Sequence, residues 1–116
     1  MKKILIIEDN EAINRMLNRY LAKEGHTVKS LSNADNIPEC IRNENYDIVF
    51  FEPKLHWMDI IDKIKILLPE IKFIAMIGGY EDEKLFMELE KEGITASVQK
   101  PFELKEIKQI INFVQA

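Results

Sequence analysis

The amino-acid sequence predicts a doubly wound α/β domain in which one five-stranded parallel sheet is covered by helices on both faces. Five short β-like runs alternate with five helical patterns along the 116 residues, and the connections between them are short. Strict alternation of this kind favours a parallel sheet with right-handed crossovers. A chain of this length can bury one ordinary core, so we expect a single domain over residues 1–116.

The five strands are expected at residues 3–8, 27–31, 47–52, 72–77 and 95–99. The first, third and fourth are nearly all apolar, which is typical of strands covered by helices on both faces. The second and fifth are less apolar, so we expect them nearer the edges of the sheet.

The helices are predicted from apolar residues that recur every three or four positions. The first stripe ends at Gly25, whose freedom to adopt a positive φ suits the end of a helix, and the third stops before Pro69. The fourth closes near Gly93. The five stripes are Ile13, Met16, Leu17, Tyr20 and Leu21; Ile37, Cys40 and Ile41; Ile60, Ile61, Ile64, Leu67 and Leu68; Leu85, Phe86 and Leu89; and Leu104, Ile107, Ile110, Ile111 and Val114.

Composition excludes several classes of function. The chain has 20 acidic and 16 basic residues, a net charge of −4 and no basic stripe, so direct binding to nucleic acid is not expected. It has no signal-like or membrane-spanning apolar segment, and its single cysteine, Cys40, rules out a disulfide framework and a thiolate zinc cluster. Cys40 lies on an apolar stripe, so we expect it in the core. These features favour a cytoplasmic protein without membrane contact.

Charged residues gather where chemistry is expected. In a parallel sheet, ligands bind at the carboxyl ends of the strands. Glu8, Asp9 and Glu52 follow two neighbouring strands there, and Lys100 follows a third. Clustered carboxylates need a cation or a proton, and oxygen ligands suit Mg²⁺. The spacing alone leaves a second interpretation equally open, in which these acids face solvent and begin helices.

Four segments resemble the receiver domain of bacterial response regulators, the CheY-like family. They are KILIIEDNE at 3–11, GHTV at 25–28, DIVFF at 47–51 and KPF at 100–102. The resemblance implies a flavodoxin-like fold with strand order 2-1-3-4-5. It also implies a domain that accepts a phosphoryl group from a histidine kinase onto an aspartate ending the third strand. Mg²⁺ and the lysine before the proline assist that transfer in the family.

The family positions fall on identifiable residues of this chain. The resemblance places the acid pair at Glu8 and Asp9, the lysine at Lys100 and the phosphoacceptor at Glu52, which is not an aspartate. A glutamate carries its carboxylate one methylene further out, and such misplacement can cost about a hundredfold in rate. The longer side chain also comes within reach of Lys100, so we expect Glu52 and Lys100 to form a standing ion pair.

Further departures fall along the path by which receivers switch. The switch threonine or serine corresponds to Gly78, and the switch aromatic residue corresponds to Ser97. The proline-glycine turn expected after the acceptor is replaced by His56 and Trp57. We expect Trp57 to pack over this altered loop rather than to act as an exposed anchor.

The leading hypothesis is therefore a pseudo-receiver, a non-enzymatic module that acts through protein contacts without aspartyl phosphorylation. The resemblance implies a contact surface made of the fourth helix, fifth strand and fifth helix, used for self-association or for another protein. The charged candidates on it are Glu81, Glu88, Glu92, Lys105 and Lys108. A second interpretation stays open, in which the acidic excess between residues 81 and 92 is only a solvated helix face.

Two alternatives come from other classes. One is a competent receiver that a histidine kinase phosphorylates on Glu52 or on a neighbouring carboxylate such as Asp59, with Mg²⁺ held weakly by Glu8, Asp9 and Glu52. The other is a mononucleotide or flavin site near Gly78 and Gly79. The acidic loop after the first strand argues against the second, because it would repel a phosphate.

Overall fold

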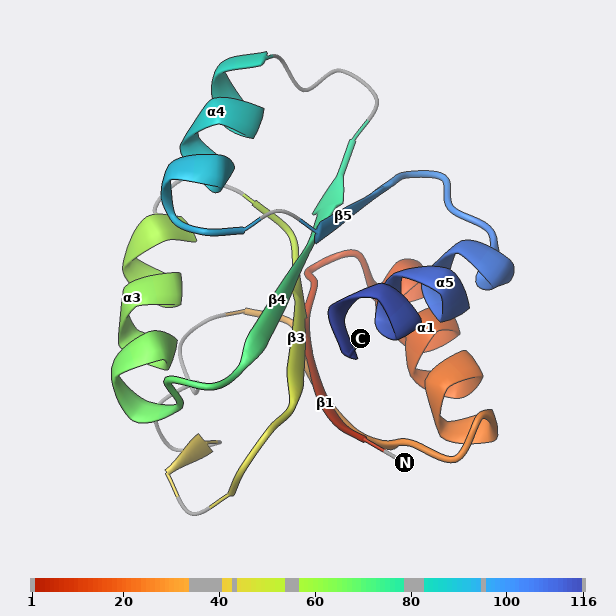
Figure 1. Ribbon diagram of the computed structural model, residues 1–116. Helices are drawn as coiled ribbons and strands as arrows, with labels where there is room; N and C mark the ends of the chain where they lie inside the picture. The colour runs from red at the N-terminus through yellow and green to blue at the C-terminus, as the bar shows by residue number, and fades with distance from the viewer. Residues whose placement is uncertain are drawn as a thin grey trace.

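The computed structural model describes residues 2–33, 41–42, 44–53, 57–78, 83–94 and 96–115. Within these residues five parallel strands form one sheet in the order β2-β1-β3-β4-β5 (Figure 1). This order is the one that the receiver resemblance implied. The strands are β1 (Lys3–Ile7), β2 (Thr27–Leu31), β3 (Ile48–Phe51), β4 (Lys72–Ile77) and β5 (Ala96–Gln99).

The expected bounds of two strands are corrected by the structure. β1 ends at Ile7 rather than at residue 8, and β3 covers Ile48–Phe51 rather than 47–52. The pairing of Ile7 with Phe51 is the last step of the β1–β3 ladder, so Glu8 and Glu52 come directly after it. Both acidic residues therefore begin loops at the same edge. The expected start of the fifth strand, Thr95, lies outside the described residues.

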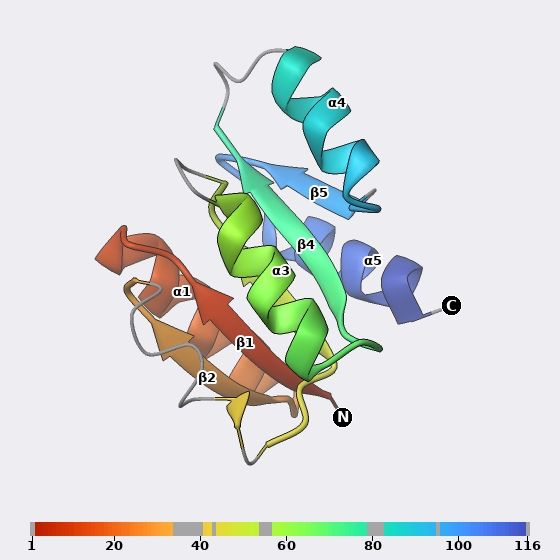
Figure 2. The ribbon, with the colours of Figure 1, turned by 90° about the vertical axis from the view of Figure 1, so that its left-hand side faces the viewer.

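The described residues contain four of the five expected helices, α1 (Glu11–Lys23), α3 (Trp57–Leu67), α4 (Glu83–Lys91) and α5 (Leu104–Gln115). The expected second helix falls mainly on residues 34–40, which lie outside the described residues together with Cys40. Helices α1 and α5 cover one face of the sheet, and α3 and α4 cover the other (Figures 1 and 2). None of the described helices is long and apolar enough to cross a membrane.

Alternate residues of the central strands enter two separate hydrophobic clusters. Leu5, Val49 and Phe73 face α3 and α4, where they pack in one cluster with Ile61 and Leu89. The intervening residues face α1 and α5 and form the second cluster, whose members include Ile4, Ile6, Phe50, Ile74, Leu17, Leu21, Ile107 and Ile111. Because successive side chains of a strand point to opposite faces, the apolar runs β1, β3 and β4 supply both clusters at once.

Some members of the predicted helical stripes are not in the core. Leu17 and Leu21 are fully buried, but Met16 is 41% exposed and Phe86 is 47% exposed. Leu67 and Leu104 are also partly exposed, at 47% and 43%. The predicted buried stripes were too wide, because a helix packed on a sheet buries only the centre of its apolar stripe. The residues at the margins of the stripe stay in solvent.

Candidate functional site

Backbone hydrogen bonds place the three main residues of the candidate site immediately beyond three strands. The amide of Glu8 donates to the carbonyl of Leu31 at 3.0 Å, and the amide of Glu52 donates to the carbonyl of Ile7 at 3.1 Å. The amide of Lys100 donates to the carbonyl of Ile77 at 2.7 Å. Each residue thus extends the ladder by one step past the regular strand. The sheet brings together side chains that lie up to 92 positions apart in the sequence.

Lys100 joins the two glutamates. Its ammonium donates to Glu52 Oε2 at 2.7 Å and also forms a hydrogen-bonded ion pair with Glu8 Oε1. The predicted Glu52–Lys100 ion pair is therefore confirmed. The bridge to Glu8 was not predicted, although the sequence placed all three residues at one edge.

The shared ammonium lies in a largely buried environment. The side chain of Glu8 is fully buried, and those of Lys100 and Glu52 are only 18% and 16% exposed. Burial acts to lower the pKa of Lys100, but the hydrogen bonds and attraction to Glu52 and Glu8 outweigh it, so this pKa is raised. Lys100 is therefore held in its charged form. Glu8 Oε2, by contrast, is buried without a hydrogen-bond partner in the described structure.

Two asparagines hold the loop after β1. Asn10 caps the start of α1, and its Oδ1 accepts a hydrogen bond from the amide of Ile13 at 3.1 Å. Asn14 Nδ2 donates to the carbonyl of Glu8 at 2.9 Å and to the carbonyl of Leu31 at 3.1 Å. Asn14 thereby ties the ends of β1 and β2 to α1. Sequence reasoning missed Asn14, although a short amide residue on the strand-facing side of a helix is a usable signal for such a contact.

The expected magnesium ligands do not form a complete group in the structure. Asp9 is exposed, while Glu8 and Glu52 each give one oxygen to Lys100. Among the described residues, no three His, Cys, Asp or Glu side chains lie together so that they could hold a metal ion. The three carboxylates in this arrangement therefore do not fit a three-ligand magnesium site, and their metal role stays a prediction.

The resemblance assigns the switch positions to Gly78 and Ser97, and that assignment stays a prediction. Gly78 follows β4 directly, and Ser97 lies in β5 opposite Ala75. Ser97 is exposed and borders a hollow of about 240 Å³ whose other described lining residues are Phe86, Leu89, Glu90 and Ile94. Neither position carries the side chain that the receiver pattern expects. Gly79 and Tyr80, which follow Gly78, lie outside the described residues.

Trp57 is the first residue of α3 and is only 6% exposed. Its ring stacks on Phe51, with centroids 6.0 Å apart and an interplanar angle of 30°. Trp57 is therefore buried as expected, and the alternative of an exposed anchor is wrong, while its packing over the loop stays a prediction because residues 54–56 lie outside the described residues. Because Phe51 immediately precedes Glu52, this aromatic pair lies close to the candidate site in the chain. His56 is outside the described residues.

The candidate contact surface is only partly free. The ammonium of Lys65 in α3 donates to the carbonyl of Glu92 at 2.6 Å and lies 3.6 Å from its carboxylate, so Glu92 joins α4 to α3. Glu88 is half-buried, whereas Lys105 and Lys108 are exposed. Glu81 lies outside the described residues. Lys105 is 3.5 Å from Glu103, an exposed pair of small energetic weight.

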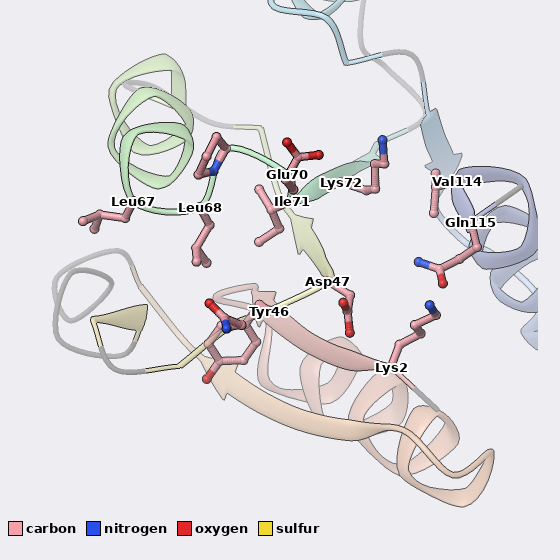
Figure 3. Close-up of a pocket in the computed structure, with 12 residues that line it drawn as sticks. Lys2, Tyr46, Asp47, Leu67, Leu68, Glu70, Ile71, Lys72, Val114 and Gln115 are labelled. Atoms are coloured by element: carbon pink, nitrogen blue, oxygen red, sulfur yellow. The ribbon is translucent and has the colours of Figure 1, made fainter.

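A cavity of about 520 Å³ lies at the opposite edge of the sheet, where the strands begin (Figure 3). Lys2, Asp47 and Lys72 line it together with Ile71 and Gln115. Asp47 Oδ2 already accepts a hydrogen bond from the amide of Lys3 at 2.8 Å. This cavity is separate from the Glu8, Glu52 and Lys100 cluster, which lies at the carboxyl edge.

Comparisons with known proteins agree with the fold. Residues 4–112 match the family described as the response regulator receiver domain. Sporulation initiation phosphotransferase F of Bacillus subtilis is 27% identical over 113 residues, which cover 95% of this chain and 90% of that protein. DNA-binding transcriptional regulator NtrC of Azospirillum brasilense is 26% identical over 111 residues, which cover 93% of this chain but only 23% of that protein.

Solved structures of receiver proteins have a similar fold. A response regulator receiver domain protein from Clostridium thermocellum is similar with a TM-score of 0.82 and 28% identity, covering 98% of this chain and 94% of that one. Chemotaxis protein CheY4 of Vibrio cholerae has a TM-score of 0.87 at 15% identity over 98% of both chains, a likeness of fold alone. Since the family match extends over nearly the whole chain, we conclude that this protein belongs to the response regulator receiver domain family.

Proposed function

We propose that this two-component receiver domain, formed by residues 1–116, is a pseudo-receiver that works through protein contacts without aspartyl phosphorylation. The observation that carries the proposal is the ion pair of 2.7 Å between Lys100 and Glu52 at the phosphoacceptor position. The longer acid places a permanent negative charge beside the lysine.

The ion pairs around the Glu52 carboxylate support this proposal. Lys100 also pairs with Glu8, so two carboxylates hold one ammonium in a largely buried setting. For Glu52 Oε2 to attack a phosphorus atom, it would have to leave this pairing, and the partner charges would lose compensation in a poorly solvated place. The extra methylene also moves the oxygen away from the place that an aspartate would occupy.

The switch positions give independent support. The resemblance implies a hydroxyl at Gly78 and an aromatic ring at Ser97 that respond to the phosphoryl group. Gly78 has no side chain that could form a hydrogen bond, and Ser97 is exposed and has no aromatic ring that could move inward. A phosphoryl group on Glu52 would thus lack the two side chains that pass its effect to α4 and β5.

The output of such a module lies on its outer faces. We infer that α4, β5 and α5 form the contact surface, with Glu88, Lys105 and Lys108 among its charged residues. Glu92 contributes less than the sequence indicated, because it is engaged by Lys65.

A second candidate function is a receiver that is phosphorylated by a histidine kinase on Glu52 or on Asp59, which is exposed in the first turn of α3. The unpartnered, buried Glu8 Oε2 favours it, since this oxygen could face a bound cation. In that case Glu8 and Asp9 would hold Mg²⁺, which typically shields the charge of the phosphoryl group in receiver domains.

Intact mass spectrometry after incubation with acetyl phosphate and Mg²⁺ distinguishes the two functions. We expect no phosphoryl adduct on the natural chain, and we expect Glu52→Asp to gain one because the shorter acid restores the reach of an aspartate. Asp59→Asn, which leaves Glu52 in place, is the matched control. A stoichiometric adduct on the natural chain that hydroxylamine removes would contradict the pseudo-receiver proposal, and its loss in Asp59→Asn would assign it to Asp59.

A further inference from the structure

The free face of α4 is apolar at its centre and acidic at its ends. Phe86 and Met87 are 47% and 59% exposed, although both are large apolar side chains. Glu83 and Glu90 are exposed on the same side of the helix, because positions i, i+3, i+4 and i+7 share one face. Leu89, which faces the sheet, is buried. Two apolar side chains on an outer helix surface indicate a place where another surface binds.

A groove with mainly basic charge, the α1–α5 groove, lies along α1 and reaches Leu104 at the start of α5. It has a volume of about 580 Å³, and its apolar floor comes from Met16, Tyr20 and Leu104. Met16 and Leu104 are 41% and 43% exposed. Arg19 and Lys23 line the same groove, and Glu24 is the one acidic residue in its described lining. Neither of the two basic residues forms an ion pair with any residue in the described ranges, so their charges are available to an acidic partner.

The two surfaces also match in length. Arg15, the third basic residue of the groove, already pairs with Glu11 at 2.6 Å, but both side chains are well exposed and the pair is weak. Arg15 to Lys23 covers about 12 Å of helix axis, and Glu83 to Glu90 covers about 10 Å. An acidic helix of the length of α4 therefore suits the row of basic residues along the groove.

We propose that the chain associates with itself head to tail, with α4 of one copy bound in the α1–α5 groove of the next. Phe86 and Met87 then contact the apolar floor, while Glu83 and Glu90 face the basic row. The argument for a second copy is that one chain carries both complementary surfaces. This inference rests on the proposed function only in using α4 as a protein contact, and it does not depend on whether Glu52 is phosphorylated.

The placement of the two surfaces decides the kind of assembly. Helix α4 covers one face of the sheet, and α1 and α5 cover the other, so the surfaces point in different directions (Figure 1). Binding through two different surfaces is heterologous and leaves one of each kind free at the ends of a growing row. The row either closes into a ring or extends. One helix in one groove is a small interface, so each contact is weak and salt-dependent.

Sedimentation velocity of the full chain over a wide range of concentration tests the association itself. We expect the average mass to rise with concentration at low salt, and the rise to diminish at high salt. A sample that sediments as a single chain at every concentration in low salt would overturn the proposal.

Paired charge reversals test which surfaces meet. The helix variant Glu83→Lys with Glu90→Lys keeps an intact groove, and the groove variant Arg19→Glu with Lys23→Glu keeps an intact helix. Each alone should associate at least about tenfold more weakly, because like charges then oppose each other. Their equimolar mixture should recover association, with the two variants alternating along the row, because every contact between them then brings opposite charges together.

Two controls distinguish loss of the specific contact from a change in net charge and from misfolding. Asp62→Lys with Glu70→Lys changes the net charge as the helix variant does, at exposed positions outside both surfaces, and should leave association unchanged. Circular dichroism confirms that each variant is folded. If the helix variant associates as strongly as the natural chain, or if the mixture fails to recover association, the head-to-tail arrangement is wrong, whereas the phosphorylation result on Glu52 is unaffected.

Discussion

At the scale of single residues, Lys100 has more influence on the candidate site than any acid around it. Its ammonium is the common partner of Glu8 and Glu52, and its raised pKa means that the folded state favours its charged form. The stabilisation from this raised pKa is complete below the ordinary value of 10.5, and it disappears as the pH rises through the higher folded value.

Replacing Lys100 with methionine should therefore destabilise the fold at neutral pH. The apolar chain keeps most of the volume but leaves two largely buried carboxylates without their cation, so we expect a loss of about 2 kcal/mol in the free energy of unfolding. Urea unfolding at pH 7 measures it. Lys105→Met removes a 74% exposed lysine from a surface pair and should cost under about 0.5 kcal/mol. Equal losses in the two variants would show that the buried bridge contributes nothing special.

His26 provides a pH-dependent contact far from the candidate site. The amide of Lys2 donates to His26 Nδ1 at 3.1 Å, which requires that nitrogen to be unprotonated. Burial, assisted by nearby positive charges, lowers the pKa of His26 below 6.5. The folded state then binds fewer protons than the unfolded state, so the stability gained above pH 6.5 is lost as the pH falls through the folded pKa.

The His26→Asn variant tests this dependence, because asparagine keeps an acceptor but does not titrate. We expect the difference in stability between the natural chain and the variant to shrink when chemical denaturation is repeated from pH 7.5 down to pH 5.5. NMR titration of the His26 ring gives the folded pKa directly. A folded pKa at or above 6.5 would be inconsistent with the buried, accepting nitrogen.

At the scale of elements, two helices end in the same way. The amides of Gly25 and His26 donate to the carbonyls of Ala22 and Leu21 after α1, and Gly93 and Ile94 repeat the pattern after α4. Gly25 has φ of 93°, and Gly93 has φ of 79°. A β-carbon at Gly25 would meet nothing within 4 Å, so only the backbone conformation disfavours a side chain there.

Gly25→Ala should thus cost about 1 kcal/mol of folding stability, the conformational penalty for a positive φ. Gly25→Asn should cost less, because asparagine tolerates this region better than alanine. Thermal unfolding of the two variants and the natural chain measures both. If alanine proves no worse than asparagine, the positive φ is not what makes glycine favourable at this helix end.

The helices also show which features can be predicted from the sequence and which cannot. The ends of α1 and α4 were predictable because Gly25 and Gly93 carry a local signal. The exposure of Met16 and Phe86 was not, because a stripe of apolar residues does not reveal how far a neighbouring helix or strand extends. Likewise, the engagement of Glu92 by Lys65 depends on the spacing between α3 and α4, which no local pattern contains.

At the scale of the whole molecule, the strand order was predictable from the receiver resemblance, and alternation of elements alone predicted a parallel sheet. The gathering of Glu8, Glu52 and Lys100 followed from the same topology, since parallel strands end at one edge. The bridge from Lys100 to Glu8 needed side-chain directions that sequence spacing does not give. Asn14 was missed for the same reason.

One sheet shared by two clusters implies that both faces unfold together. Leu17→Ala removes a fully buried side chain from the α1–α5 cluster, and Ile61→Ala removes one from the α3–α4 cluster. We expect each to cost about 3 kcal/mol. Each should also give one transition that coincides by circular dichroism and by the fluorescence of Trp57, the single tryptophan. A Leu17→Ala variant that lost helix signal before Trp57 responded would show that the faces unfold separately.

The bridged lysine also affects which charged molecules can approach this edge of the sheet. Glu8, Asp9 and Glu52 bring three negative charges to this edge, and Lys100 brings one positive charge that is already shared by two of them. The local field therefore repels anions, and at a low ionic strength that repulsion slows their approach. A small phosphate ester would therefore associate slowly with this edge of the sheet, whereas a cation would associate faster.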